Sequence, residues 1–189
     1  MPPQLAAFLF VLRLWRLPAR SEHETTKFSH SETVVRAATI EDYTALCALF
    51  IELDAFHRAA RPDLFVPPPD PPRSLEYVQS FISGNDSAVF VAEQSRAVVG
   101  FITVKSEHRP ATPVRPARVH AEVDSLVVAS ASRRSGIGKL LVKRAETWSL
   151  ERGATRLLIG VFAFNRSARR FYRKVGYEPQ TLMLARSLR

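Results

Sequence analysis

The sequence has little cysteine, and Cys47 is the single one among 189 residues. One cysteine excludes an internal disulfide, and with it any disulfide argument for a secreted fold. The residues beside Cys47 are apolar, so we expect this thiol to be buried and structural rather than nucleophilic. The five histidines are scattered. No spacing of cysteine and histidine suggests a metal site, and we expect no metal.

Acidic residues are scarce toward the C-terminus. Residues 1–120 carry 13 Lys/Arg and 13 Asp/Glu, whereas residues 121–189 carry 14 Lys/Arg and 5 acids, which accounts for the whole net charge of +9. A basic half of this kind attracts polyanions. Nucleic acid is one such partner and a cofactor with several phosphates is another. The charge alone does not choose between them.

A long uninterrupted apolar run is also missing. Leu5–Leu17 is apolar, but Arg13 and Arg16 interrupt it, and it is too short and too charged to span a bilayer. Acid-poor leaders that contain arginine also resemble organelle transit peptides. We interpret residues 1–32 as an N-terminal leader that is disordered, serves targeting, or lies on a surface as a helix. We expect a cytoplasmic protein without a membrane span, and the leader leaves organelle targeting open.

Strand and helix patterns alternate along residues 33–189, without internal repeats, and predict one mixed α/β domain. A helix begins after Thr39, which forms a capping box with Asp42, and it runs to about His57. Prolines between residues 62 and 72 predict a loop. The other predicted helices are Ser74–Ile82, Gly136–Arg152 and Ser167–Val175, and the predicted strands are Thr33–Arg36, Ala88–Glu93, Val98–Ser106, Ala117–Val128, Arg156–Phe162 and Gln180–Leu188.

The loop from Arg133 to Gly138 carries the strongest local signal. It reads Arg-Arg-Ser-Gly-Ile-Gly and joins a predicted strand to a predicted helix. Glycines let the backbone approach a ligand closely, and the start of a helix presents unpaired N–H groups. With the arginines and Lys139, these features predict a site for a pyrophosphate. The loop is not a Walker A sequence, and it lacks the third glycine of a dinucleotide fingerprint.

Two matched stretches make the chain similar to the GNAT superfamily of N-acetyltransferases. The first is the apolar triplet Leu126–Val128 followed by Arg133–Gly138, which fits the family's Q/R-x-x-G-x-G/A. The second is Asn165–Tyr177, which fits Asn-x-x-A-x-x-F-Y-x-K-x-G-F/Y. The resemblance covers residues 33–189 and is closest to uncharacterised bacterial-type members. It implies a twisted, mostly antiparallel mixed sheet with one splayed parallel strand pair and helices on both faces.

The same resemblance implies acetyl-CoA as co-substrate. The triplet would pair with the pantetheine arm, the backbone of the glycine loop would hold the pyrophosphate, and Asn165 would bond the pantetheine amides. Basic residues of the last helix would reach the ribose phosphate or form a solvated face. The expected cofactor-binding residues are Leu126, Val127, Val128, Arg133, Arg134, Ser135, Gly136, Ile137, Gly138, Lys139, Asn165, Ala168, Tyr172 and Lys174.

The resemblance also implies catalytic roles. Tyr172 matches the family's tyrosine near the sulfur and is expected to be the general acid, while the Val128 N–H would contact the oxyanion. Glu122 lies where histone-type members carry their glutamate, so it is a possible base through water or else an exposed strand carboxylate. Alternation would set Glu122, Asp124 and Leu126 on one strand face. Members that acetylate ribosomal-protein N-termini use an acid where this chain has Gly160, which weakens that assignment.

The acceptor is expected to be a primary amine of a small molecule or peptide. Asp54, His57 and Phe65, from the first helix and the loop after it, are the expected substrate-binding residues, and Glu52 with Asp54 would attract a cationic amine. We expect a monomer or homodimer that binds no specific nucleic acid, because no nucleic-acid motif or interleaved aromatics accompany the basic half. A non-catalytic acyl-CoA-binding or regulatory module is the alternative function.

Overall fold

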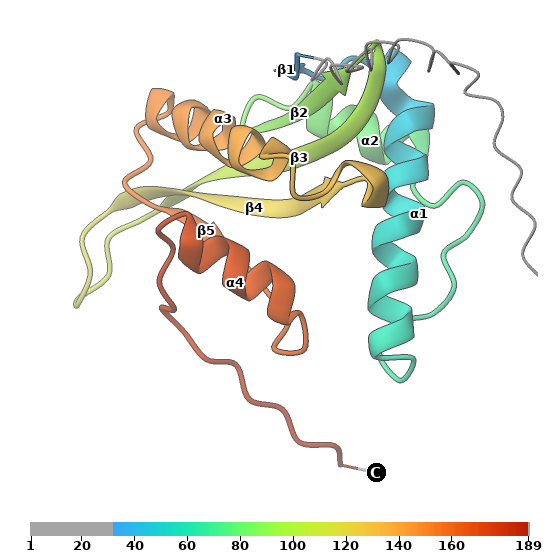
Figure 1. Cartoon of the computed structure of the whole chain (residues 1–189). Coiled ribbons are helices and arrows are strands. Elements are labelled where there is room, and N and C mark those ends of the chain that lie inside the picture. The colour runs from blue at the N-terminus through green and yellow to red at the C-terminus, as the bar shows by residue number, and fades with distance from the viewer. Residues whose placement is uncertain (1–31, 189) are drawn as a thin grey trace, which may run out of the picture. The chain divides into compact units, whose positions relative to one another are not determined.

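The structure, a computed structural model, describes residues 32–188, so nearly all of the predicted leader lies outside the described residues. Within this range five strands form one sheet in the order β1-β2-β3-β4-β5, antiparallel as far as β4, with β4 and β5 parallel. Figure 1 shows the sheet between two layers of helices. The elements are β1 Val34–Ala37, α1 Tyr43–Ala60, α2 Leu75–Ile82, β2 Ser87–Gln94, β3 Ala97–Arg109, β4 Arg118–Val128, α3 Ile137–Glu151, β5 Leu157–Ile159 and α4 Arg166–Lys174, with short 3-10 turns at Ile40–Asp42 and Ser130–Ser132.

Each face of the sheet has its own apolar core. On one face α1 and α2 cover Val91, Phe101 and Val127 with the side chains of Leu46, Leu49, Phe50, Val78 and Phe81. On the other face α3 covers Phe90, Ile102, Val104, Ala121 and Val123 with Ile137, Leu141, Ala145 and Trp148. The mixed sheet with helices on both faces confirms the fold implied by the resemblance.

The start of α1 is fixed by a buried carboxylate. Asp42 accepts two hydrogen bonds of 2.8 Å from the Arg36 guanidinium and one of 2.9 Å from the Thr39 N–H. The hydrogen bonds from Arg36 are the largest cause that lowers the pKa of Asp42 below its usual range. The hydrogen bond of the predicted capping box in which the Asp42 carboxylate accepts the Thr39 N–H is therefore present. Arg36 in addition joins the start of α1 to β1.

Most predicted boundaries agree with the structure, but Gln180–Leu188 is not a strand. Strands need neighbours that supply hydrogen bonds to their backbone. No strand is assigned within this segment, and Leu182, Met183 and Leu184 are 78%, 92% and 84% exposed. β5 is also shorter than predicted, since it ends at Ile159 rather than Phe162.

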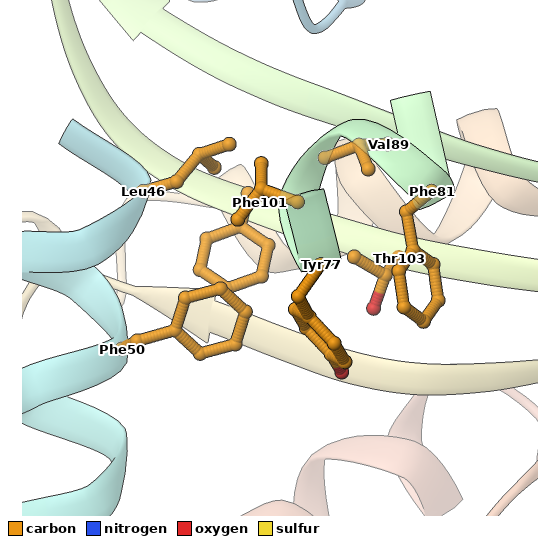
Figure 2. Close-up of a pocket in the computed structure, with 8 residues that line it drawn as sticks. Leu46, Phe50, Tyr77, Phe81, Val89, Phe101 and Thr103 are labelled. Atoms are coloured by element: carbon orange, nitrogen blue, oxygen red, sulfur yellow. The ribbon is translucent and has the colours of Figure 1, made fainter. Parts of the chain in front are cut away.

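The core between α1, α2 and the sheet contains a small gap of about 10 Å³. The side chains around it, most of them apolar, are those of Leu46, Phe50, Tyr77, Val78, Phe81, Val89, Phe101 and Thr103. Figure 2 shows this part of the core. This volume is about that needed for one water molecule. It is therefore a packing gap and not a ligand site.

Candidate active site

The parallel strands β4 and β5 separate after three residue pairs. Their pairing joins Ala121 to Leu157, Glu122 to Leu158 and Val123 to Ile159. β4 then continues to Val128, whereas β5 ends at Ile159. The gap beside residues 124–128 of β4 is the splayed strand pair that the resemblance implied.

Backbone groups of β4 face this gap. The Ala129 N–H donates to the Val99 carbonyl of β3 at 2.9 Å. Backbone groups alternate in direction along an antiparallel strand, so those of Leu126 and Val128 turn away from β3 and toward the gap. The end of β4 thus offers an edge that no strand pairs, to which an extended ligand with amide groups can add as a strand does.

A bulge in β4 changes which residues share a face. Thr103 of β3 pairs with Ser125 and Val104 pairs with Val123, so Asp124 is the extra residue. Leu126 consequently packs on the α3 side with Val123. Glu122 lies on the opposite side, across from Lys105, whose ammonium lies 4.9 Å from the centre of the Phe81 ring of α2. The expected alternation that set Glu122 and Leu126 on one face is therefore wrong.

Two carboxylates of β4 remain near the point where the strands part. Glu122 is an exposed side chain in the last paired stretch. Asp124 is the first residue beyond the pairing, and one of its carboxylate oxygens lies 3.4 Å from the Lys105 ammonium. The structure thus gives the site a second carboxylate that sequence reasoning did not select.

The loop between β4 and α3 has the backbone of an anion site. Arg134 has a φ of +65° and Gly136 a φ of +89°, both in the left-handed region. Residues alternating into this region turn successive N–H groups toward one side. Gly136 is the N-cap of α3, and the buried Ile137 after it anchors the helix start. The N–H groups of the first helical turn and the helix dipole therefore favour an anion here.

Arg133 turns away from the helix start. Its Nε donates to the Val128 carbonyl at 2.9 Å, and its Nη2 lies 3.5 Å from Glu52 Oε2 of α1. The same carboxylate oxygen accepts the Ser130 N–H at 3.0 Å. Glu52, expected beside the acceptor, instead binds the glycine loop to α1.

Helix α4 packs closely on the start of α3. The backbone of Gly138 leaves room for Phe171, because a side-chain carbon on Gly138 would lie 3.2 Å from the Phe171 ring. Asn165 caps α4 by accepting the Ala168 N–H at 3.0 Å. Its side-chain oxygen is thus committed to the helix, which leaves its amide NH₂ as the group for a ligand.

Tyr172 borders the same core as Leu126 and Val128. Its half-buried ring lies edge-on to Phe171 at 5.1 Å and to Tyr177 at 5.8 Å. Burial raises the pKa of Tyr172 to about 12. The hydroxyl therefore stays protonated at neutral pH, as a hydrogen-bond or proton donor requires.

A basic groove lies between α3 and α4. It has a volume of about 430 Å³ and contains the expected Lys139 and Lys174 as well as Lys143, with Val142, Glu146, Val175 and Gly176. Lys139 is exposed in the first turn of α3, next to the glycine loop. The groove therefore extends the positive region away from the loop and suits a further phosphate.

Aromatic rings gather where the acceptor was expected. His57 stacks on Phe65 at 5.0 Å and meets Phe162 edge-on at 5.5 Å. Desolvation lowers the pKa of His57, with Asp54 opposing the shift. Asp54 itself accepts bonds of 2.9 and 3.0 Å from Arg73. The structure thus brings His57 and Phe65 together, while Asp54 is held by an arginine.

Sequence reasoning missed Phe56, Phe162 and Phe164 of this cluster. Phe162 and Phe164 are alternate residues directly before Asn165, and that spacing was the available signal. Within residues 32–188 no group of His, Cys, Asp and Glu side chains is arranged to hold a metal ion. In the same range no helix is long and apolar enough to cross a membrane.

Comparisons of the sequence with known proteins identify a family and a relative. Residues 53–177 match the model of the acetyltransferase (GNAT) family. The uncharacterized N-acetyltransferase YhfO of Bacillus subtilis (strain 168) is 26% identical over 147 residues, which are 78% of this chain and 91% of that protein.

Two solved structures share the fold. A tetramutant of the BH1408 protein from Bacillus halodurans has a TM-score of 0.78 at 24% identity, over 82% of this chain and 99% of that chain. The aminoglycoside N-acetyltransferase AAC(6')-Iy in complex with CoA has a TM-score of 0.64 at 17% identity, over 84% of this chain and 96% of that chain.

Proposed function

Because the chain belongs to the acetyltransferase (GNAT) family, we propose that it transfers the acetyl group of acetyl-CoA directly to a primary amine of a small molecule or peptide. The observation that carries the proposal is the open gap between β4 and β5, where the edge of β4 has no strand partner and leads straight into the loop at the start of α3. An acyl-CoA combines an extended amide arm with a pyrophosphate. Those are the two chemical features that this edge and this loop complement.

The residues present fit this co-substrate. The backbone groups of Leu126 and Val128 would bind the pantetheine amides, together with the amide NH₂ of Asn165. The first turn of α3, with Arg134 and Lys139, would hold the pyrophosphate. Lys174 in the groove beside α4 would meet the remaining phosphate. The structural relative crystallised with CoA supports this choice of ligand.

Transfer requires two proton movements that the side chains of this chain can serve. Acetyl-CoA supplies an acetyl group activated as a thioester. The amine nitrogen forms a bond to the carbonyl carbon, the carbon–sulfur bond breaks, the amine loses a proton and the departing thiolate gains one. Tyr172, whose hydroxyl is protonated at neutral pH and lies beside the core that contains Leu126 and Val128, is the proposed donor toward the sulfur.

The proton of the amine needs an acceptor. Glu122 is the proposed base, acting through water because it is exposed and lies on the side of the sheet opposite Leu126. Replacing Glu122 with Gln is expected to shift the pH-rate profile of the reaction. A profile identical to that of the parent protein would remove Glu122 from the mechanism.

The first experiment is a calorimetric titration of acetyl-CoA into the full chain. We expect one-to-one binding that Arg134→Ala and Lys139→Ala weaken and that rising salt also weakens. Arg118→Ala, at the other end of β4, is the matched control and should bind as the parent does. The absence of binding at low salt would contradict the proposal. Binding without thiol release in the presence of any primary amine would indicate a non-catalytic acyl-CoA-binding module.

A further inference from the structure

Five aromatic rings from three segments meet at one place in the molecule. Phe56 and His57 come from α1, Phe65 from the loop after it, and Phe162 and Phe164 from the segment between β5 and α4. Phe162 stacks on Phe164 at 5.3 Å and meets Phe65 edge-on at 5.3 Å. Phe56 lies 6.1 Å from Phe164. We call these five residues the ring cluster.

The ring cluster lies near one end of the gap between β4 and β5. Phe162 follows Ile159, the last residue of β5, by three positions. On the other side, Glu52 binds the Ser130 N–H just beyond the end of β4, and Phe56 lies one helical turn further along α1. The rings therefore lie near the ends of the two separated strands, where the part of an amine substrate that does not react would be bound.

Part of the ring surface is open. Phe56 is 40% exposed and Phe162 is 46% exposed, although both contact other rings of the cluster. Exposed apolar surface that is grouped in this way marks a binding site more often than scattered apolar side chains do. The cluster is thus available to a ligand and is not a closed part of the core.

The carboxylates around the cluster are already paired. Asp54 binds Arg73 through both of its oxygens, and Asp63 binds Arg61 through both of its own. Glu52 binds the Ser130 N–H and faces Arg133. A polycationic acceptor needs several unpaired carboxylates to replace its hydration, and these three acids do not offer them. Burial also lowers the pKa of His57, so the cluster carries no positive charge at neutral pH that would repel an amine.

We propose that the acceptor is an arylalkylamine, a single primary amine joined by a short chain to an aromatic ring. Its ring stacks against Phe162, Phe164 and His57, and its amine reaches the gap between β4 and β5. The proposal rests on the proposed function, because it names the amine for the same acetyl transfer. Aromatic rings also attract the ammonium form of such an amine as it enters.

The test compares initial rates of thiol release from acetyl-CoA with three acceptors, 2-phenylethylamine, ethylamine and the aminoglycoside kanamycin. We expect kcat/KM for 2-phenylethylamine to exceed that for ethylamine by roughly tenfold or more, since burying one aromatic ring contributes at least this much. Kanamycin should be the poorest acceptor. Equal or faster transfer to kanamycin or ethylamine would overturn the inference.

Single substitutions test whether the ring cluster causes the preference for 2-phenylethylamine. Phe162→Ala is expected to raise KM for 2-phenylethylamine roughly tenfold while KM for acetyl-CoA stays unchanged, and Phe162→Tyr is expected to restore the parent value. Leu150→Ala, at a side chain on α3 that is 72% exposed, is the control and should leave all parameters unchanged. Melting temperatures establish that each variant folds. If Phe162→Ala lowers the rates for ethylamine and 2-phenylethylamine equally, the ring cluster does not bind the acceptor.

Failure of this inference and failure of the proposed function give different results. If acetyl-CoA binds and some other amine is acetylated while 2-phenylethylamine is not, the acceptor class is wrong and the acetyltransferase remains. If acetyl-CoA does not bind in the calorimetric titration, the proposed function fails and the inference fails with it.

Discussion

The Glu52 carboxylate of α1 lies 3.5 Å from the Arg133 guanidinium of the glycine loop and accepts the Ser130 N–H through the same oxygen. Arg133 also donates to the Val128 carbonyl at the end of β4. Helix α1, which carries Phe56 and His57 of the ring cluster, is thus joined to the strand and loop that would bind acetyl-CoA. The arginine that the resemblance assigned to the pyrophosphate is, in this structure, bonded to the end of β4 and lies beside a carboxylate of α1.

Removing the contact of Glu52 with Ser130 and Arg133 should weaken acetyl-CoA binding, although Glu52 is not proposed to contact acetyl-CoA. Glu52→Ala is expected to raise KM for acetyl-CoA about two- to fivefold, which is the effect of a partly exposed ion pair. Glu52→Gln keeps an acceptor for the Ser130 N–H and should recover part of the loss. Steady-state kinetics with Glu151→Ala, which breaks the exposed contact with Arg144, provide the control. A parent-like KM in Glu52→Ala would show that the loop does not need α1.

Tyr172 and Tyr177 offer a matched pair for the proton donor. Their rings meet at 5.8 Å, but the Tyr177 hydroxyl is bonded to Glu146 at 3.2 Å. Tyr172→Phe is expected to lower kcat roughly a hundredfold with little change in the Kd of acetyl-CoA. Tyr177→Phe should cost about 1 kcal/mol of unfolding free energy and keep its turnover. Equal turnover in the two variants would exclude Tyr172 as the acid.

Local signals in the sequence predicted the helix boundaries well. Gly136 and Gly153 bracket α3, Ser74 accepts the Tyr77 N–H at the start of α2, and the prolines after α1 exclude regular structure there. Each of these effects acts within a few residues along the chain. Because these signals are local, the sequence alone predicts the helix boundaries. It also predicts the loop between β4 and α3 that is proposed as the anion site.

The features that the sequence did not predict depend on contacts between segments that are distant along the chain. The bulge at Asp124 arises from how β4 aligns with β3, and it moves Glu122 to the face opposite Leu126. The ring cluster forms because β5 ends at Ile159, so that Phe162 leaves the sheet and reaches α1. Gln180–Leu188 was predicted as a strand from local sequence, but strand formation also depends on backbone pairing with another segment, which local sequence does not reveal.

The protonation of His57 should be visible in the pH dependence of stability. Desolvation lowers its folded pKa below the ordinary value of 6.5, so the folded state favours the neutral ring. The stability contributed by neutral His57 is present above pH 6.5 and is lost as the pH falls below it. Between about pH 7 and pH 5, the unfolding free energy of the parent should therefore fall more than that of His57→Gln. Chemical denaturation at several pH values measures both curves, and parallel curves would contradict the shift.

The left-handed backbone at Gly136 allows the anion site to be tested with an internal control. Gly136 has a φ of +89° and Gly153 a φ of +73°, and at neither position would a side-chain carbon meet an atom within 4 Å. Alanine at either position is expected to cost about 1 kcal/mol of unfolding free energy through backbone strain alone. Thermal unfolding should therefore show similar losses in the two variants.

Acetyl-CoA binding should separate these two variants. Only Gly136 lies in the loop that is proposed to bind the pyrophosphate, so Gly136→Ala should raise the Kd of acetyl-CoA roughly tenfold, the loss of one charge-assisted hydrogen bond. Gly153→Ala, past the far end of α3, should bind acetyl-CoA as the parent does. If both variants bind equally well, the backbone of the loop does not hold the pyrophosphate, and the positive side chains at the start of α3 would have to do so alone.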